Sequence, residues 1–443
     1  MSDTDLDRII SAYERFVPRE FLRLLGKEDI TRLRLGDHVE KSMTFLFADI
    51  RNFTSLSESI TPQECFFFLN SYLSRMEPVI LAHHGVIDKF IGDAIMALFP
   101  TSADDALACA ITMLNQLPFY NDGRQRAGYR EIRIGIGLNT GLAILGTIGG
   151  AGRMEGTVIS DAVNLASRLE KVNKTYGTQL LIGEHTLYSL RDPARYHIRF
   201  LDRIAVSGKE MPQSVYEVFD ADPPALRTGK EKTRRLFVEA LAHYHYQHIP
   251  VAMKLLHRCL DSNPEDRSAW VYLERCRRFL ATGVHESTGE LSCNLVWSEK
   301  YQIGVPEIDA QHQELFRRAS QFLHAVSDDE RQQEATALLE FLNSFVVTHF
   351  DAEERLMKEQ GYPFYQAQKS QHEKLKKYFA RIRQELRQTS REDRFYTMFR
   401  FQLLVADWLI NHTLREDRHL GKFLREKEAA PAEPLHDDGN DSR

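Results

Sequence analysis

The chain has few cysteines and none of them are paired in the sequence. Its 443 residues include 5 cysteines, which lie far apart and never form a CxxC motif. A disulfide framework and a zinc ribbon both need closely spaced cysteines. We therefore expect reduced, mostly buried thiols.

Long apolar runs and a surplus of one charge are missing as well. No run approaches the roughly 18 apolar residues that cross a bilayer, and the start, MSDTDLDRII, lacks the segments of a signal peptide. The 57 basic and 63 acidic residues are well mixed and give a net charge of -6, so no basic surface is indicated. We expect a cytoplasmic protein that binds small molecules or protein, with no nucleic acid and no membrane as partner.

Alternating strand and helix patterns fill the first half of the chain. With 43% hydrophobic residues the chain has enough apolar material for packed cores, and its length suggests roughly three domains. Interleaved strands and helices with hairpins predict an α+β sheet covered by helices. The expected elements are strands at 43–49 and 178–182, helices at 62–83, 103–116 and 160–172, hairpins at 86–99 and 131–148, and a strand pair at 197–219.

The second half is predicted to be helical. Residues 225–283 contain three helices broken at Pro250 and Pro264, and their pattern resembles about one and a half tetratricopeptide units. They form either a packing connector or a peptide-binding groove, and we favour the connector. The expected order is a helical lead-in (1–40), an α+β domain (41–222), the connector (225–283), a linker (284–296), an all-α up-down four-helix bundle (297–426) and a disordered tail (427–443).

Two apolar runs in the first half of the chain each contain an aspartate beside a turn. MTFLFADI ends near Asp49, and IDKFIGDAIMALF carries Asp93 beside Gly92. Acidic residues at the ends of two buried strands suggest a divalent metal next to a phosphate, although aspartate is also common in ordinary turns. Further along, Asn164 and Arg168 are four residues apart and share one helix face, where an amide and a guanidinium suit a sugar and a phosphate.

Four blocks in this region resemble the class III nucleotide cyclases over about 40–220. They are FADIRNFT, KFIGDAIMALF, RIGIGLNTG and VNLASRLE, in the order and spacing of the family. The resemblance implies a ferredoxin-like domain, an antiparallel-rich sheet covered by helices. It also implies a homodimer, because in the family the aspartates come from one subunit and the remaining site residues from the other.

The resemblance assigns roles to single residues. Asp49 and Asp93 match the pair that holds two Mg2+ or Mn2+ ions, with the Ile50 carbonyl assisting. The ions would lower the pKa of the ribose 3′-hydroxyl and neutralise phosphate charge. Asn164 and Arg168 match the catalytic residues that position the ribose and stabilise the transition state.

Other matched positions concern the triphosphate and the purine. Lys209 resembles the phosphate-binding lysine, although Ser207 stands where the family has a second basic residue. Lys89 and Thr157 occupy the positions that read the base and imply ATP, with GTP as the alternative. Arg153 is a further candidate for the triphosphate.

The C-terminal part is dense in histidines and carboxylates at helical spacing. His349 and Glu353 are four residues apart in THFDAEERLM and share a helix face. A lone histidine on an apolar helix is usually a core residue, but several helices that each offer one toward a common interior predict a metal cluster. The candidate ligands are His312, His349, Glu353, His372, His412 and Asp417.

These residues lie in blocks that resemble bacteriohemerythrin over about 297–425. The blocks are WSEKYQIGVPEIDAQH, HFDAEE, YPFYQAQKSQH and WLINHTLRED, and they imply a non-haem di-iron site that binds O2. Gln368 departs from the family, which has a further histidine at that position. The glutamine either ligates through its carbonyl oxygen or leaves a second open position, which shifts the expected role from reversible O2 binding toward NO or redox sensing.

Together the two resemblances imply an adenylate cyclase regulated by O2, NO or redox state at a di-iron site. The alternatives are a guanylate cyclase of the same architecture, or an oxygen- or iron-binding protein with a weak cyclase half. The sign of the regulation and the downstream pathway do not follow from the sequence.

Overall fold

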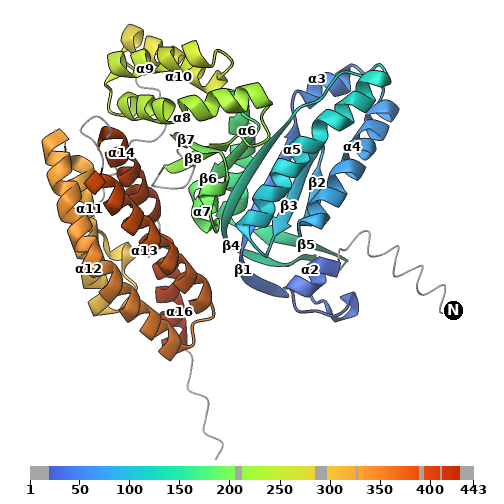
Figure 1. The fold of residues 1–443 in the computed structure, drawn as a ribbon. Coiled ribbons are helices and arrows are strands. Elements are labelled where there is room, and N and C mark those ends of the chain that lie inside the picture. Colours follow the sequence, from blue (N-terminus) through green and yellow to red (C-terminus); the bar gives the residue numbers. More distant parts are fainter. Residues whose placement is uncertain are drawn as a thin grey trace, which may run out of the picture. The chain divides into compact units, whose positions relative to one another are not determined.

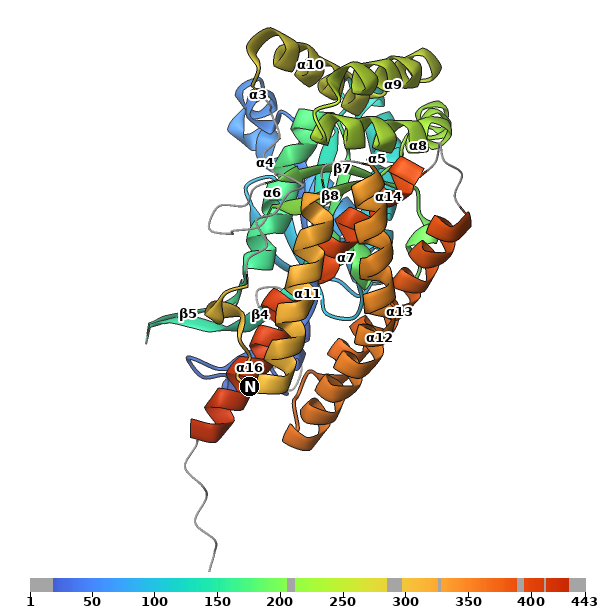
Figure 2. The same cartoon turned by 90° about the vertical axis from the view of Figure 1, so that its left-hand side faces the viewer.

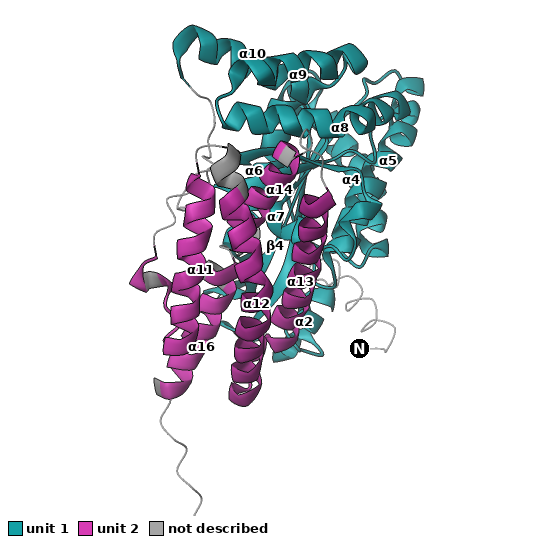
Figure 3. Cartoon of the chain, turned by 60° about the vertical axis from the view of Figure 1, so that its left-hand side comes forward, with its two compact units in different colours: residues 1–290 teal, residues 291–443 magenta. Residues whose placement is uncertain are grey.

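The structure is a computed structural model. Contacts divide the chain into two compact units, residues 1–290 and 291–443 (Figure 3). No helix among the described residues is long and apolar enough to cross a membrane. The described residues are 19–150, 152–204, 212–284, 297–325, 328–388, 394–409 and 412–429, so the start of the predicted lead-in, nearly all of the predicted linker and most of the predicted tail lie outside them. Residues 427–429, predicted to begin the disordered tail, are instead helical.

The described part of unit 1 is built on one eight-stranded sheet, in the order β2-β3-β1-β4-β6-β8-β7, with β5 paired to β4. The pairings are antiparallel except that β4 and β6 are parallel. The predicted α+β sheet covered by helices is confirmed. Its strands are β1 (His38–Ile50), β2 (Val86–Ile91), β3 (Ala94–Phe99), β4 (Ile134–Gly150), β5 (Arg153–Ile159), β6 (Leu180–Gly183), β7 (Ile198–Ile204) and β8 (Gln213–Val218).

β1 is a central strand, with β3 on one side and β4 on the other. Its residues 43–48 are all buried, which explains why this stretch is apolar at nearly every position instead of at every second one. Met43, Phe45 and Phe47 belong to one apolar cluster that includes Ala162 and Ala166. β1 therefore lies at the centre of the sheet and contributes to the hydrophobic core of unit 1.

The hairpin predicted at 131–148 is wrong in its position. Residues 134–150 form the single strand β4, which pairs with β1 along its length and then turns into β5. The Asn-Thr-Gly sequence at 139–141 has turn-forming composition, but Thr140 pairs with Thr44 of β1 and their hydroxyls lie 2.8 Å apart. The true hairpin, β4–β5, extends beyond the body of the unit (Figure 2).

Three long helices pack against this sheet. α4 (Pro62–Ala82) starts with a capping box of Thr61 and Glu64, and α5 (Ala103–Arg126) lies beside it (Figure 1). α6 (Asp161–Tyr176) packs on β4 and β1. At Gly137 a Cβ would approach the Ala166 backbone oxygen to 2.3 Å, so glycine is required for α6 to lie this close to the sheet.

The three helices of the predicted connector belong to unit 1 by contact. They are α8 (Pro224–His245), α9 (Ile249–Ser262) and α10 (Arg267–Thr282). α8 contacts β7, and α10 contacts α6 (Figure 1). The breaks lie next to the two predicted prolines: Pro250 is in the first turn of α9, and Pro264 lies between α9 and α10. Proline is tolerated in a first turn but not in a helix interior.

Unit 2 is a bundle of long helices (Figure 3). Its last segment contains two π-helical turns, Val405–Leu409 and Thr413–Asp417. π-helical turns are rare in proteins, and those that occur are often found at functional sites. The α-helices are α11 (Pro306–His324), α12 (Asp328–Gln360), α13 (Tyr365–Gln388), α14 (Arg394–Leu404) and α16 (Arg418–Ala429).

Candidate active site and metal centre

Two aspartates meet at the end of β1. Asp49 is the second-to-last residue of β1, and Asp93 lies in the turn between β2 and β3. The antiparallel pairing of β1 with β3 brings this turn beside Asp49. The Ile50 backbone N–H donates to Asp93 Oδ2 at 3.2 Å, so Ile50 also lies at this pair.

The acidic pair has the electrostatics of a cation site. Burial, together with the hydrogen bond and charge of Asp49, raises the pKa of Asp93 to about 7. Two neighbouring carboxylates repel each other when both are ionised. A hard cation that takes oxygen ligands, such as Mg2+, relieves this repulsion. Tyr72, whose buried hydroxyl has no hydrogen-bond partner in the described part of the chain, has its pKa raised by burial and then by both aspartates. The donor set fits a divalent ion.

Lys89 and Thr157 come together from distant parts of the sequence. Lys89 lies on β2 and Thr157 on β5, and Lys89 Nζ donates to Thr157 Oγ1 at 3.4 Å. The same Nζ lies 3.5 Å from the carboxylates of Asp88 and of Glu155. The ammonium is therefore held in place beside a hydroxyl, within a single chain.

Asn164 and Arg168 face away from the sheet. Leu165 and Leu169 are buried on the sheet side of α6, whereas Asn164 is exposed and Arg168 is half-buried. Within the described residues neither side chain has a hydrogen bond or an ion pair. An amide and a guanidinium on one free helix face are available to a ligand or to another chain.

Arg153 and Lys209 are the remaining candidates for the cyclase site. Arg153 is exposed at the first residue of β5. Lys209 lies outside the described residues, between β7 and β8. In the described part of the chain no hydrogen bond or ion pair joins Asn164 or Arg168 to the acidic pair or to Lys89. One copy of the chain thus presents separate groups of site residues.

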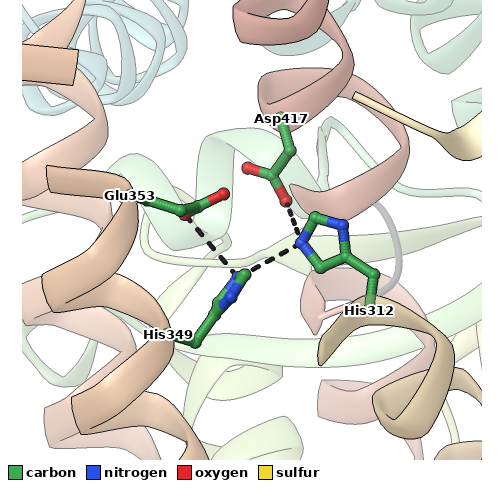
Figure 4. Close-up of side chains that lie close together, drawn as sticks. All are labelled: His312, His349, Glu353 and Asp417. Atoms are coloured by element: carbon green, nitrogen blue, oxygen red, sulfur yellow. Dashed lines mark hydrogen bonds and ion pairs between the residues drawn. The ribbon is translucent and has the colours of Figure 1, made fainter. Parts of the chain in front are cut away.

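A second cluster of side chains lies inside unit 2. His312 is on α11, His349 and Glu353 on α12, and His372 on α13. Two sets have ligand atoms that all lie within 4.8 Å of one another. The sets are His312, His349, Glu353 and Asp417, shown in Figure 4, and Glu353, His372 and His412.

The four histidines form two pairs whose Nε2 atoms face each other. His312 Nε2 and His349 Nε2 are 3.2 Å apart, and His372 Nε2 and His412 Nε2 are 3.1 Å apart. Ring nitrogens at this spacing share either one proton or a common ligand atom. In each of the two sets the ligand atoms lie close enough together to hold a metal ion, and Glu353 belongs to both sets.

Outer contacts fix the rings of two of these histidines. His349 Nδ1 lies 2.8 Å from Gln311 Oε1, and His372 Nδ1 lies 3.2 Å from Glu354 Oε1. Phe350 stacks on the His372 ring with 3.8 Å between centroids. Metal-binding histidines usually donate their second N–H to such acceptors, which orients the ring. The arrangement leaves both Nε2 atoms directed at the cluster.

Burial sets the charge state of this cluster. Burial and then the charge of His312 lower the pKa of His349, and burial lowers the pKa of His372 to about 2. Burial and then Asp417 raise the pKa of Glu353, and neither oxygen of Glu353 has a hydrogen-bond partner in the described chain. Neutral imidazoles beside buried carboxylates are the donors that borderline metals such as iron prefer.

A π-helical turn brings the last two candidate ligands together. His412 and Asp417 are five residues apart, and the turn Thr413–Asp417 is π-helical. In an α-helix residues at this spacing point in different directions, whereas a π-helical turn aligns residues i and i+5. His412 Nε2 lies 3.4 Å from Asp417 Oδ1 as a result.

Gln368 lies inside the cluster as well. Its side chain is buried, and its Nε2 donates to Asp417 Oδ1 at 3.0 Å. Its Oε1 has no hydrogen-bond partner among the described residues. The amide therefore contacts a candidate metal-binding carboxylate as a hydrogen-bond donor.

Family models match the two units separately. Residues 37–218 match the adenylate and guanylate cyclase catalytic domain, and residues 303–424 match the hemerythrin HHE cation binding domain. The chain joins a nucleotide cyclase domain to a hemerythrin domain. Both resemblances predicted from the sequence are confirmed.

The chain is also similar to individual known proteins. The chain is 36% identical over 284 residues to a terminal-differentiation-specific adenylate cyclase of Dictyostelium discoideum, covering 63% of this chain and 13% of that protein. It is 41% identical over 224 residues to an adenylate cyclase of Anabaena cylindrica, covering 49% of this chain and 45% of that protein. The chain thus spans less than half the length of either. A crystal structure of the guanylyl cyclase Cya2 is 34% identical, with a TM-score of 0.38, over 42% of this chain and 95% of that one.

Sequence reasoning missed several residues of both sites. In the hemerythrin domain these are Gln311 and Glu354, which orient histidine rings and stand directly next to His312 and Glu353 in the sequence. That adjacency is the only signal that points to them. In the cyclase domain Tyr72 lies on α4 with no pattern that marks it, because a buried tyrosine on an amphipathic helix resembles any core residue.

Proposed function

We propose that this chain is an adenylate cyclase that converts ATP into 3′,5′-cyclic AMP and pyrophosphate. The observation that supports this most is the pair Asp49 and Asp93 at the end of β1, where the Ile50 N–H, next to Asp49 in the chain, donates to Asp93. Adjacent carboxylates on a rigid strand are suited to the metal ions that accompany a nucleoside triphosphate.

The site residues divide the work of the reaction. Mg2+ or Mn2+ held by Asp49 and Asp93, with Ile50 assisting, would supply charge neutralisation at the phosphates and acidify the ribose 3′-hydroxyl. Asn164 holds the ribose through its amide. Arg168 offers guanidinium N–H groups to the oxygens where negative charge grows during the displacement at the α-phosphorus.

Cationic side chains complete the contacts with the phosphates. We assign Lys209 and Arg153 to the triphosphate, because anionic oxygens are matched by ammonium and guanidinium donors. These contacts bind the substrate and stabilise pyrophosphate as it leaves.

The purine is read by the pair on β2 and β5. Adenine presents N1 as an acceptor and its N6 amine as a donor. Lys89 Nζ, which lies 3.4 Å from Thr157 Oγ1, donates to N1, while the Thr157 hydroxyl accepts from the amine. Guanine would direct an N1–H donor at Lys89, leaving two donors facing each other. The pair therefore favours ATP over GTP.

A homodimer with two shared sites agrees with the placement of α6. Asn164 and Arg168 have no partner in the described part of their own chain. A second copy that supplies Asp49 and Asp93 opposite them would complete a site, and two-fold symmetry would make two such sites.

The test is a product assay with the full purified chain. Cyclic AMP and cyclic GMP are measured from ATP and GTP with Mg2+ or Mn2+. We expect cyclic AMP from ATP, and a kcat/KM for GTP at least about 10-fold lower, the effect of one mismatched hydrogen bond. No product from either nucleotide would overturn the proposal, and equal use of GTP would overturn the purine assignment.

We propose further that two irons in the hemerythrin domain regulate this activity. His312, His349, Glu353, His372, His412 and Asp417 would hold them, and iron there supplies binding of O2 or NO or a change of oxidation state. The buried oxygens of Glu353, which have no hydrogen-bond partner among the described residues, support a resident cation. Regulation requires that the two states of this site favour different arrangements of the dimer.

Regulation is tested in the same assay with iron-loaded protein. Cyclic AMP production is compared anaerobically, in air and with NO. We expect the rate to differ between at least two of these conditions, and the His349→Ala variant to lose the difference. Equal rates in all three would remove the regulatory role and leave the cyclase proposal standing.

A further inference from the structure

Helix α6 carries two of the proposed catalytic residues, and its C-terminal end contacts the third connector helix, α10. Tyr176 is its last residue, and Gly177 caps it in the left-handed conformation with φ 66°. Arg168 and Asn164 lie eight and twelve residues before Tyr176, or about 12 and 18 Å along the axis at 1.5 Å per residue.

Helix α10 binds this end of α6 with two side chains. Arg275 Nη2 donates to the Tyr176 hydroxyl at 2.9 Å, and Ser268 Oγ donates to the Tyr176 backbone oxygen at 3.3 Å. The other arm of the guanidinium, Nη1, donates to Asp202 Oδ2 of β7 at 2.9 Å. Tyr176 itself donates its hydroxyl proton to the same carboxylate. One arginine thus ties α6, β7 and α10 together.

The contact is dry and closely packed. Tyr176, Asp202 and Ser268 are 2%, 1% and 1% exposed, so their hydrogen bonds form with little competition from water. The Tyr176 ring stacks on Tyr272 of α10 with 6.3 Å between centroids. At Gly177 a Cβ would come within 2.4 Å of the Arg267 side chain, so α10 approaches the end of α6 as closely as glycine allows.

We propose that Arg275 is a positioning residue for the cyclase reaction. By holding Tyr176 it fixes the rotation and axial position of α6, and with them the directions of Arg168 and Asn164. The inference rests on the proposed function of those two residues. It assigns Arg275 of α10 to support of the cyclase domain. The α10 side chains that contact Tyr176 pack against the sheet unit and are not available to bind a peptide.

Catalysis should be sensitive to this contact. A displacement of about 1 Å in a catalytic group costs roughly 100-fold in rate. Arg168 is proposed to act on charge that develops in the transition state, so a shift of α6 lowers kcat while leaving KM for ATP nearly unchanged. A purely structural contact would lower the amount of folded protein and leave kcat per folded dimer unchanged.

The test uses two variants of the full chain and one matched control. Tyr176→Phe removes only the hydroxyl and keeps the Arg275–Asp202 pair. Arg275→Lys keeps the positive charge but cannot reach both partners. Tyr272→Phe is the control, because it removes an equally buried hydroxyl of the same interface, which donates to the Leu201 backbone oxygen at 2.7 Å and forms no hydrogen bond with α6.

We expect Tyr176→Phe and Arg275→Lys to lower kcat at least 10-fold with KM within twofold of the wild type. Tyr272→Phe should keep kcat within twofold. A wild-type kcat in Tyr176→Phe, or an equal loss in Tyr272→Phe, would overturn the inference.

A second measurement does not depend on activity. Amide hydrogen exchange of residues 161–176 should rise in Tyr176→Phe and remain unchanged in the control. A wild-type chain that makes no cyclic nucleotide overturns the proposed function. The exchange data then still decide whether Arg275 holds α6, since unchanged exchange in both variants overturns that contact as a positioning device.

Discussion

The proposed preference for ATP depends on Lys89. Lys89 has three carboxylate or hydroxyl oxygens within 3.5 Å, so its ammonium has a defined direction. A change of sign at this position would place a carboxylate beside Asp88 and Glu155 and remove the donor to adenine N1.

We predict that Lys89→Glu lowers kcat/KM for ATP about 10- to 100-fold, the value of one charged hydrogen bond of about 1.5–3 kcal/mol. The measurement is initial-rate kinetics with ATP and with GTP. Lys254→Glu, at an exposed lysine of α9, is the control for the charge change and should keep wild-type kinetics. Unchanged use of ATP in Lys89→Glu would contradict the assignment of Lys89 to the base.

The candidate iron cluster has a glutamine, Gln368, where the family resemblance led us to expect a histidine. It donates to Asp417 at 3.0 Å and supplies no imidazole. Each of the two candidate ligand sets contains two histidines that face each other.

We predict that Gln368→His raises the iron that survives dialysis against a chelator, because imidazole binds iron more strongly than an amide oxygen. Gln368→Leu, which removes the hydrogen bond to Asp417, should weaken retention by roughly 10-fold. The measurement is elemental analysis for iron per chain. Gln321→His, on the exposed face of α11, controls for an added histidine. Equal iron content in Gln368→His and the wild type would contradict this view.

At the scale of elements, a buried charge cluster joins the connector to the sheet. Arg199 of β7 donates to Glu217 of β8 at 2.6 Å and to both oxygens of Asp266 at 2.6 and 2.8 Å. Lys230 of α8 donates to Glu217 and Asp222 at 2.6 Å each. Buried charges in such a cluster depend on their partners, because removing one leaves another desolvated and unpaired.

We predict that Asp266→Ala lowers the free energy of unfolding of unit 1 by about 3–5 kcal/mol. Chemical denaturation measures the loss, and amide exchange in α8 and α10 locates it. Asp261→Ala, at an exposed position of α9, should change stability by less than about 0.5 kcal/mol. A change of that small size in Asp266→Ala would show that Arg199 is stabilised by Glu217 alone.

The contribution of Asp266 to stability depends on pH. Burial pulls the pKa of Asp266 upward, but Arg199 outweighs it and the pKa lies below its ordinary value of 3.8. The folded chain therefore keeps this carboxylate ionised to lower pH than the unfolded chain does. The contribution of Asp266 to the free energy of unfolding is fully present above the ordinary pKa and is lost as the pH falls through the folded pKa. The difference in free energy of unfolding between wild type and Asp266→Ala should therefore narrow only in acid.

At the scale of the whole molecule, one copy of the chain presents the acidic pair and the α6 face without a direct contact between them. Either the domain closes on ATP by itself or two copies share each site. The unpaired Asn164 and Arg168 favour the second arrangement.

We predict that Asp49→Ala and Asn164→Ala, each inactive alone, recover activity when mixed. A hybrid dimer has one site with both defects and one with neither, so random exchange should restore about a quarter of wild-type activity in a two-fold dimer. The measurement is cyclic AMP production after subunit exchange, with the heterodimer verified by mass. Verified heterodimers that remain inactive would contradict shared sites. Mixing Asp49→Ala with Asp93→Ala is the control and should restore nothing.

The sequence by itself determined the two families, the α+β and helical classes, and the candidate residues, because these follow from local patterns. Apolar runs that end in Asp49 and Asp93, proline breaks in the connector and histidines at helical spacing are all visible within a few neighbours. Local composition also misled at residues 139–141, where a turn-like sequence lies in the middle of β4, since pairing with β1 outweighs turn propensity.

Only the tertiary structure decided what depends on residues far apart in the chain. The family resemblance grouped Lys89 with Thr157 and His412 with Asp417, but the Lys89–Thr157 hydrogen bond and the π-helical turn that aligns His412 with Asp417 are visible only in the structure. The contact of Arg275 with Tyr176 has no signal in the sequence. Each depends on how whole elements pack, and a pattern of neighbouring residues carries no information on the distance between two elements. The positions of functional groups were therefore predictable, while the contacts that orient them were not.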